Sequence, residues 1–208
     1  MLEVRNPKSF FDNNPKELEE VTSVVNSAFG RSLEFEDIYQ HVTSPEQVLL
    51  LRQDKRLVAM ASYNSLEFER MTDCSCLIVE GIAVIPEMQG KRVFRTITDN
   101  VVNENYHYLC LRTQNPRMYR ALQNFCLATS PSGNRIPKEL SKVMRNLASY
   151  LKCQIDKNGV IKGYYGRLFY GIEPTHNEID PLFQSLGIDK NNGDGLLVVG
   201  EIREGHYV

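Results

Sequence analysis

The sequence predicts an α/β fold in which a central mixed β-sheet is flanked by helices. Two observations predict it: segments with helical spacing of apolar residues alternate with short, apolar, β-prone runs, and a polar basic turn follows one of these runs. A chain of 208 residues can bury one sizeable core without requiring a second domain. We therefore expect a single domain over residues 1–208.

The first helix is predicted between Pro15 and Gly30. Asn13 or Asn14 opens it, Pro15 suits its first turn, and the apolar residues that follow form one stripe: Leu18, Val21, Val25, Ala28 and Phe29. A second, short helix is expected over residues 34–41.

Two β-prone runs come next, at residues 48–52 and 57–63. The polar residues 53–56 between them predict an antiparallel hairpin. Further strands are expected over residues 77–85 and 108–112.

Two helices alternate with these later strands. The first is expected to run from residue 94 to residue 105 or 106, because its apolar residues keep helical spacing: Phe94, Ile97 and Val101. Pro116 suits the first turn of the second, which is expected to end at about residue 125. Together these elements predict a core of about residues 15–125.

The remaining residues, 126–208, extend beyond this core. The elements expected there are a loop, two helices and a closing strand: residues 130–134, 140–151, 179–187 and 196–202. Residues 159–171 combine four aromatic side chains with glycines, which is typical of a strand or hairpin. They either line an acceptor pocket or form an aromatic core contact.

Charge and composition limit the partners. Charged residues make up 24% of the chain and the formal net charge is −2, so no global field draws the protein onto nucleic acid or an anionic membrane. The five cysteines lack paired zinc-knuckle spacing and the four histidines are scattered, so we expect reduced thiols and no metal site. Residues 189–195 resemble a calcium loop only superficially, because the glycine falls at the fifth position instead of the sixth.

The first fourteen residues contain neither a basic region followed by an apolar core nor any long apolar run. This pattern predicts a cytoplasmic protein without a membrane span. The sequence leaves open whether the protein forms a homodimer.

The most informative segment is the strand over residues 77–85 with the basic turn that follows it, residues 89–92. A turn between a strand and a helix presents successive backbone N–H groups, so it can hold a phosphate-sized anion. Lys91, Arg92 and Arg95 add positive charge to the same rim. An ordinary strand-to-helix connection is the alternative, because glycine-containing turns after strands are common.

Residues 84–91, V-x-P-x-x-Q-G-K, resemble the acetyl-CoA motif of the GNAT superfamily of N-acetyltransferases. That motif runs Gln or Arg, two residues, Gly, one residue, then Gly or Ala. Starting at Gln89, the two small positions are occupied by Arg92 and Phe94. A glycine at the first of them lets the backbone approach a pyrophosphate closely. Arg92 supplies a positive charge there, but its side chain hinders that close approach. The order of predicted elements over residues 15–125 also matches the GNAT core.

The resemblance implies that acetyl-CoA is the co-substrate and that its pantetheine arm lies where strands 77–85 and 108–112 splay apart. It implies that the backbones of Ile82 and Val84, with Ala83 between them, bind the pantetheine amides. The residues implied to hold the pyrophosphate and the rest of CoA are Gln89, Gly90, Lys91, Arg92, Val93, Phe94, Arg95 and Asn115.

Glu80 is the candidate general base, because a protonated alkyl amine must lose a proton before its lone pair can attack a thioester. It precedes Val84 by four residues and matches a position where many GNAT members carry a glutamate facing the acceptor. A salt bridge with a basic side chain such as Arg112 is the alternative role. The backbone N–H of Val84 is implied to stabilise the tetrahedral oxyanion.

The resemblance also implies a tyrosine that gives a proton to the departing CoA thiolate. Tyr119 is the only tyrosine in the helix predicted at residues 116–125. The family spacing counted from Asn115 falls on Leu122 instead. Proton donation and a packing or adenine-side role therefore both stay open for Tyr119.

Two functions are consistent with these patterns. The first is an N-acetyltransferase that moves an acetyl group from acetyl-CoA to an amine by direct attack in a ternary complex. The second is a catalytically weak or inactive relative that acts as an acyl-CoA sensor or a protein interaction module. Residues 89–91 and Glu80 favour the first, whereas Arg92 and Phe94 favour the second. The sequence does not name the amine, because loops and residues 126–208 form that pocket.

Overall fold

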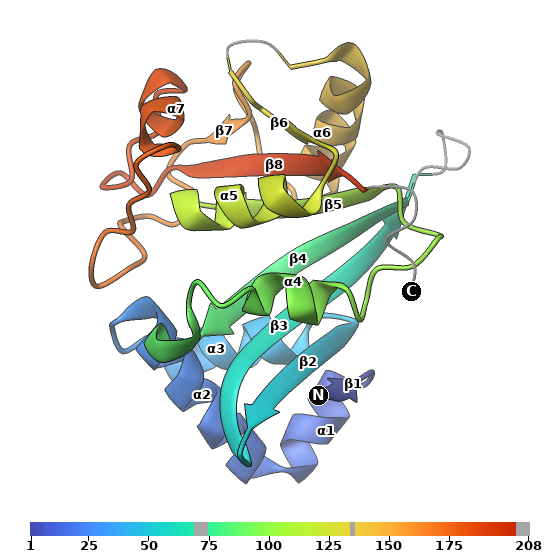
Figure 1. Ribbon diagram of the computed structural model, residues 1–208, viewed down its shortest axis with the longest axis vertical. Coiled ribbons are helices and arrows are strands. Elements are labelled where there is room, and N and C mark those ends of the chain that lie inside the picture. Colours follow the sequence, from blue (N-terminus) through green and yellow to red (C-terminus); the bar gives the residue numbers. More distant parts are fainter. Residues whose placement is uncertain (69–74, 134–135, 203–208) are drawn as a thin grey trace. The chain divides into compact units, whose positions relative to one another are not determined.

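The computed structural model describes residues 1–68, 75–133 and 136–202 (Figure 1). The chain divides into two compact units, residues 1–66 with 77–102 and residues 67–76 with 103–208. Each unit combines β-strands with helices, so the predicted α/β class is confirmed. The expectation of a single domain stays a prediction.

The first unit contains three helices ahead of its main strands: α1 (Pro7–Asn13), α2 (Pro15–Phe29) and α3 (Phe35–Thr43). α2 confirms the first predicted helix, and Gly30 ends it in the left-handed conformation with φ 64°. α3 confirms the second. α1 has no counterpart among the predicted helices, although Asn6 and Pro7 are ordinary start signals and the Asn6 side chain accepts the N–H of Ser9.

Four strands of the first unit lie in the order β1-β2-β3-β4: Leu2–Val4, Gln47–Gln53, Arg56–Glu67 and Ser75–Val84. The β1–β2 and β2–β3 pairs are antiparallel. Asp54 and Lys55 connect β2 to β3 with positive φ angles of 49° and 68°, which suits a tight hairpin turn. The predicted hairpin and the strand after it are confirmed, whereas β1 was outside the predicted elements.

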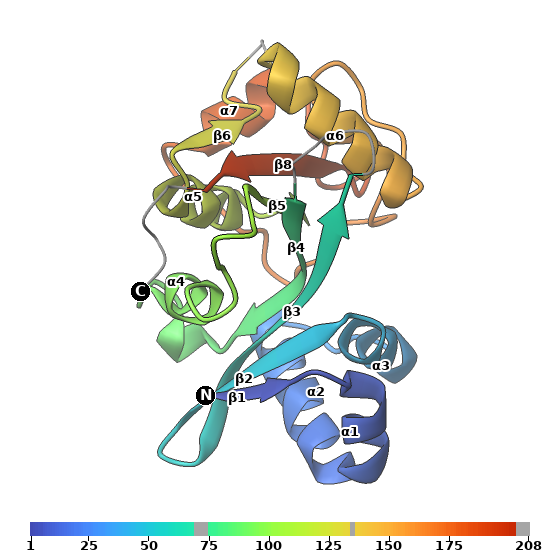
Figure 2. The same cartoon turned by 90° about the vertical axis from the view of Figure 1, so that its right-hand side faces the viewer.

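A hydrophobic core joins α1, α2 and α3 to one face of these strands (Figure 2). Its members include Phe11, Val21, Ile38, Leu50, Met60 and Ala83. α4 (Val93–Thr98) lies on the other side of the strands, where the buried hydroxyls of Tyr63 and Thr98 meet at 3.1 Å. Because side chains alternate along a strand, the two faces of β3 serve different layers.

α4 is shorter than predicted, so the expected helix to residue 105 or 106 is wrong at its end. Residues 99–101 form turns. Asn100 explains the early end: its side-chain Nδ2 donates to the Thr96 carbonyl at 2.7 Å, and its backbone N–H turns to Ile97 at 3.2 Å. A side chain that takes the carbonyl of the next helical bond competes with continuation of the helix.

β8 is the central strand of the second unit and pairs antiparallel with three others. The strands are β5 (Tyr108–Thr113), β6 (Ala128–Ser130), β7 (Val160–Ile161) and β8 (Gly195–Glu201). The helices are α5 (Pro116–Phe125), α6 (Lys138–Tyr150) and α7 (Asp180–Ser185). α5 and α6 pack against β8. The predicted strands at 108–112 and 196–202 and all three predicted helices are confirmed.

The strand or hairpin predicted over residues 159–171 is wrong except for β7. Turns flank β7, because Gly159 before it and Gly163 and Gly166 after it take left-handed φ angles of 81°, 62° and 68° that interrupt an extended chain. The aromatic rings there contact one another, with centroids 4.8 Å apart for Tyr164 and Tyr165. Tyr164 is exposed and the other three aromatic side chains are half-buried, so the acceptor-pocket and aromatic-core alternatives both stay predictions.

Candidate functional site

The turn predicted to bind a phosphate connects β4 to α4 in the first unit. β4 ends at Val84, a 3₁₀ turn covers Pro86–Met88, and residues 89–92 lead into α4. The Gln89 side chain donates from Nε2 to the Val84 carbonyl at 3.0 Å. This hydrogen bond therefore holds the turn against the end of β4.

The backbone N–H groups of the turn fall into two sets. Those of Gln89 and Lys91 donate to carbonyl oxygens of the preceding turn at 3.2 and 3.3 Å. Those of Gly90, Arg92 and Val93 have no acceptor among the residues that the structure describes. Gly90 and Arg92 are both left-handed, with φ 76° and 60°. N–H groups in such turns form concave anion-binding sites.

Arg92 holds a conformation that glycine adopts more easily. A left-handed φ costs an L-residue about 1 kcal/mol relative to glycine. A Cβ at the neighbouring Gly90 would meet no atom within 4 Å, so that side of the turn is open. Phe94, the second departure from the GNAT motif, is 8% exposed, so its ring serves packing.

The side chains of Lys91, Arg92 and Arg95 form an exposed basic rim. Arg95 Nε lies 3.6 Å from the Asp99 carboxylate, an exposed pair one helical turn away. Neither Lys91 nor Arg92 pairs with a carboxylate of the described residues. Exposed ion pairs contribute at most about 1 kcal/mol, so the rim keeps its positive potential.

The end of β4 presents the residues implied to bind pantetheine. Ala83 is buried in the core formed with α1, α2 and α3, whereas Ile82 and Val84 are half-buried. Alternation along the strand gives Ile82 and Val84 the face opposite to Ala83. Their backbone groups stay predicted contacts of the pantetheine arm.

Glu80, the predicted base, is half-buried on β4. Its Oε1 accepts a hydrogen bond from Asn64 Nδ2 on β3 at 3.0 Å. Arg112, the alternative partner, lies in the second unit, where its guanidinium bonds the Tyr164 hydroxyl and lies 5.3 Å from that ring. The catalytic role and the ion pair of Glu80 both stay predictions.

Tyr119 is fully buried in α5, with 0% of the residue exposed. Its hydroxyl donates to the Pro131 carbonyl at 2.7 Å, and its ring meets Phe183 edge-on at 6.0 Å. Burial raises the pKa of Tyr119 to about 12. A hydroxyl already donating to a carbonyl favours the packing role over proton donation.

Asn115 precedes α5 as its N-cap, and its side chain makes two contacts in the second unit. Its Oδ1 accepts the N–H of Arg117 at 2.9 Å, which caps the helix. Its side chain also bonds Tyr170. Burial raises the pKa of Tyr170 to about 12, and the bond with Asn115 opposes that shift. Binding of CoA by Asn115 stays a prediction.

Asn64, which bonds Glu80, and Glu46, which bonds Asn64, were not among the predicted site residues. Asn64 Oδ1 accepts the backbone N–H of Glu46 at 2.8 Å, and the Glu46 carboxylate accepts the N–H of Ser65 at 2.9 Å. Asparagine is unfavourable inside a strand, so Asn64, directly after the β-prone run at residues 57–63, was the signal that could have pointed here.

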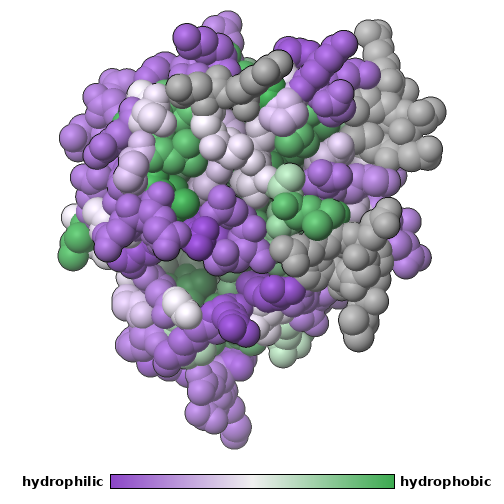
Figure 3. Space-filling view, turned by 45° about the horizontal axis from the view of Figure 1, so that its top comes forward, coloured by the Kyte–Doolittle hydropathy of each residue, from purple (hydrophilic) through white to green (hydrophobic). Residues whose placement is uncertain are grey.

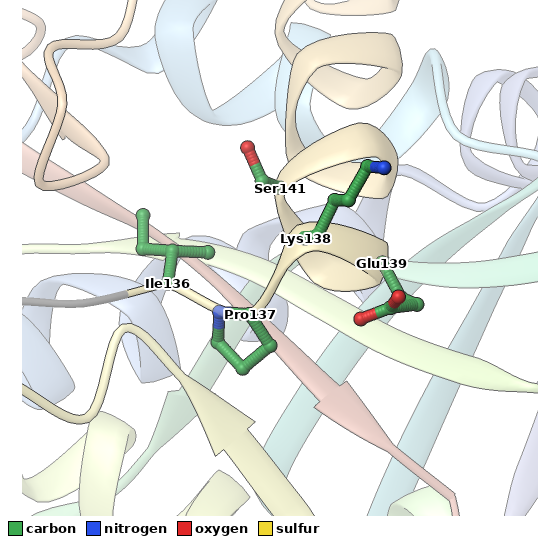
Figure 4. Close-up of a pocket in the computed structure, with 5 residues that line it drawn as sticks. All are labelled: Ile136, Pro137, Lys138, Glu139 and Ser141. Carbon is green, nitrogen blue, oxygen red and sulfur yellow. The ribbon is translucent and has the colours of Figure 1, made fainter.

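A separate surface hollow lies at the start of α6 and contains none of the predicted site residues (Figure 4). It is lined by Ile136, Pro137, Lys138, Glu139 and Ser141. Figure 4 shows the polar side chains of Lys138, Glu139 and Ser141 pointing in different directions. A ligand site gathers a few convergent polar groups, so this hollow is a weaker candidate than the turn.

Other site chemistries find little support in the described parts of the chain. No group of three or more His, Cys, Asp or Glu there could hold a metal ion. Four cysteines are free thiols, Cys76, Cys110, Cys126 and Cys153, and Cys74 lies outside the described residues. None of the described helices has the length and apolar character needed to cross a bilayer. The face in Figure 3 is mostly hydrophilic, with small apolar patches between polar side chains.

Comparisons with known proteins give structural likenesses at low identity. No protein-family model matches the chain, and no curated protein matches it. The GNAT-like decarboxylase GphF in complex with isobutyryl-CoA is 13% identical, with 91% of this chain and 97% of that chain covered and a TM-score of 0.47. The ribosomal-protein-S18-alanine N-acetyltransferase of Escherichia coli is 13% identical, with 91% and 90% covered and a TM-score of 0.45. The IAA acetyltransferase of Bacillus cereus is 16% identical, with 97% and 99% covered and a TM-score of 0.45. These values decide neither the reaction nor the substrate.

Proposed function

We propose that the protein is a GNAT-like N-acyltransferase that transfers an acetyl group from acetyl-CoA to an amine. One observation carries the proposal: the turn after β4 leaves the N–H groups of Gly90, Arg92 and Val93 without acceptors among the described residues, beside an exposed basic rim. Backbone donors and cations together bind the pyrophosphate of a CoA ester. The sequence motif at residues 84–91 supports the same ligand.

The turn fits an anion better than a purely structural role. A structural turn of this kind satisfies its own N–H groups, because a donor without an acceptor loses stability unless water or a ligand serves it. The open space at Gly90 leaves room for a phosphate oxygen to approach the backbone. The Arg92 side chain adds charge at this rim, at the position where the family motif has glycine.

Catalysis would proceed by direct attack. The Glu80 carboxylate takes a proton from the substrate ammonium, directly or through water, and the freed lone pair attacks the thioester carbonyl carbon. The backbone N–H of Val84 stabilises the oxyanion, the C–S bond breaks, and the positively charged nitrogen of the intermediate loses its second proton, which reaches the departing CoA thiolate through water. The packing contacts of Tyr119 favour water over this tyrosine as the source of that proton.

An acyl-CoA sensor without turnover is the second candidate function. Two observations favour it: the Arg92 side chain at the glycine position of the motif, and the engagement of the Tyr119 hydroxyl with Pro131. Both functions need the donor site, and only the first needs Glu80 as a base.

The donor site is tested by thermal unfolding with acetyl-CoA. A ligand that binds only the folded state stabilises it by about 2.7 kcal/mol at a concentration about 100 times its Kd. We expect acetyl-CoA to raise Tm, dephospho-CoA to raise it less, and the double charge reversal K91E/R92E to abolish the shift. Lys8→Glu, which reverses an exposed charge on α1, serves as the matched control and should keep the shift. No shift with millimolar acetyl-CoA would refute the donor assignment.

Turnover is tested by release of free CoA thiol with a polyamine, a lysine-containing peptide and a peptide with a free α-amino group as acceptors. Glu80→Gln keeps the shape of the side chain and removes proton acceptance, so turnover should fall about a hundredfold with acetyl-CoA affinity unchanged. The loss should shrink at high pH, where more amine arrives deprotonated. Equal rates for the two proteins would remove Glu80 from the mechanism, and binding without turnover in the wild type would favour the sensor.

A further inference from the structure

Asn64 occupies an unusual place, because an amide side chain stands inside β3 and touches two other segments. Its Oδ1 accepts the backbone N–H of Glu46, just before β2, at 2.8 Å. Its Nδ2 donates to Glu80 Oε1 on β4 at 3.0 Å. One side chain therefore links the entry to β2 with the predicted base.

The bond to Glu46 decides how the amide is oriented. A backbone N–H can only donate, so the oxygen of the Asn64 amide must face Glu46 and the NH₂ group must face Glu80. Glu46 is fixed in turn, since its carboxylate accepts the backbone N–H of Ser65 at 2.9 Å and also bonds the Ser65 hydroxyl. The donor that meets Glu80 is thus held by β3 and by the residue that precedes β2.

A glutamate base gains from such a fixed donor. The Glu80 side chain has three rotatable bonds, and a general base must lie within hydrogen-bond reach of the proton it takes. A carboxylate has two oxygens and several lone pairs, so one bond from Asn64 to Oε1 uses only part of its capacity to accept protons and hydrogen bonds. A donor from the amide also matches the ionised, acceptor-only form of the carboxylate that a base requires.

We propose that Asn64 is a positioning residue that holds Glu80 in its reactive orientation, an inference that rests on the proposed function. Asn64 acts through Glu80 and is not among the residues assigned to the acyl donor. Its loss should therefore lower kcat and leave the KM for acetyl-CoA unchanged.

Asn64→Asp separates this role from a structural one. The variant keeps an oxygen to accept the Glu46 N–H and replaces the donor facing Glu80 by a second carboxylate oxygen. We expect kcat to fall about tenfold or more, with KM for acetyl-CoA and the acetyl-CoA-induced Tm shift within about twofold of wild type. Asn14→Asp, the same chemical change at an exposed amide that donates to the Phe10 carbonyl, is the matched control and should keep wild-type kcat.

A double-mutant cycle with Glu80→Gln completes the test. It uses the acceptor amine with which the wild type releases CoA fastest. If Asn64 acts through Glu80, then Asn64→Ala should slow the wild type about tenfold and slow the Glu80→Gln protein little further. If the kcat of the double variant fell by the product of the two single decreases, Asn64 would act independently of Glu80 and the positioning role would be overturned. A wild-type kcat in Asn64→Asp would overturn it as well. Wild-type turnover in Glu80→Gln would instead overturn the proposed mechanism itself, so the two failures are distinguishable.

Discussion

Residues 89–92 in the first unit and residues 189–195 in the second are both polar, glycine-containing turns, yet they treat their hydrogen-bond donors differently. In the second, the Asp194 carboxylate, with 0% of its side chain exposed, collects four donors. They are Lys162 Nζ at 2.7 Å, Gly163 N at 2.9 Å, Asp189 N at 3.0 Å and Asn192 Nδ2 at 3.0 Å. In the first, the N–H groups of Gly90 and Arg92 have no acceptor among the described residues, and neither has that of Val93, which directly follows the turn. Composition does not separate a structural turn from a binding turn, whereas the account of donors and acceptors does.

The glycines of the two turns differ in the same way. Gly193 has φ 80°, and a Cβ there would lie 2.4 Å from the backbone nitrogen of Arg167. Gly90 has φ 76° and no atom within 4 Å of the same position. One glycine is required by both space and conformation, the other by conformation alone.

Alanine at each glycine gives the largest expected contrast. Gly193→Ala should lower the free energy of unfolding by about 4 kcal/mol or more, because rigid backbone atoms block the new methyl group. Gly90→Ala should cost only about 1 kcal/mol, the strain of a left-handed residue. Chemical denaturation of both variants measures the difference. Equal losses would show that the two turns are packed alike.

Acid sensitivity is the second way to sharpen the contrast, because only the second turn holds a buried carboxylate. Desolvation alone would raise the pKa of Asp194, but hydrogen bonds led by that from Lys162 outweigh it and lower the pKa from 3.8 to about 2. Since the folded-state pKa lies below the unfolded one, this stabilisation is present above about pH 4 and is lost as pH falls toward about 2. It amounts to about 2 kcal/mol.

The variant Asp194→Asn tests this acid sensitivity, because it replaces a carboxylate oxygen by an NH₂ group that faces other donors. We expect the free energy of unfolding to fall by about 2 kcal/mol at about pH 7 and to depend less on pH below about pH 4. Urea unfolding at a series of pH values measures both effects. If the variant lost stability below about pH 4 as steeply as the wild type, the pH dependence of stability would belong to other carboxylates.

Arg92→Gly addresses the open turn. The change should lower acetyl-CoA affinity about tenfold, the size of one charge-assisted contact, and should raise the stability of the ligand-free protein by up to about 1 kcal/mol as the left-handed strain is relieved. Calorimetry and denaturation measure the two effects separately. Arg92→Lys, which keeps the charge, is the control. Tighter binding in Arg92→Gly would mean that the side chain obstructs the pyrophosphate.

Lys91→Ala should have the smallest effect. An exposed cation contributes through a screened field, so we expect about a threefold loss of acetyl-CoA affinity at low salt and almost none at about 1 M salt. The control Lys8→Ala on α1 should leave acetyl-CoA affinity unchanged at both salt concentrations. A loss that persists at high salt would indicate a direct, desolvated contact instead.

The sequence predicted most helices and strands because their limits are set locally. Pro15 starts α2 because its ring fixes φ near the helical value, and Gly30 ends it because glycine readily takes the left-handed conformation. Both residues are visible in the sequence itself. The end of α4 was not predictable in this way, since it depends on the Asn100 side chain taking the Thr96 carbonyl.

The candidate site was predictable in part for the same reason. The basic turn is continuous in sequence, so its residues could be named from the motif that they resemble. Asn64 reaches Glu80, and Glu46 reaches Asn64, only through the pairing of neighbouring strands. Pro131 reaches Tyr119 only through the packing of the second unit. Contacts between residues far apart in sequence carry no local signal.

Two fully buried tyrosines, Tyr63 and Tyr119, also allow unfolding to be followed by the protein's own absorbance. The chain has ten tyrosines and no tryptophan. Burial raises the pKa of Tyr63 in the first unit and of Tyr119 in the second, while a bond to Thr98 opposes the shift of Tyr63.

In an alkaline jump, exposed phenols should therefore ionise at once, and Tyr63 and Tyr119 should ionise only when their surroundings open. Comparing the tyrosinate absorbance of the wild type with that of Tyr63→Phe and Tyr119→Phe would assign each slow phase to one unit. The order in which the two units lose their structure can thus be timed without any added label.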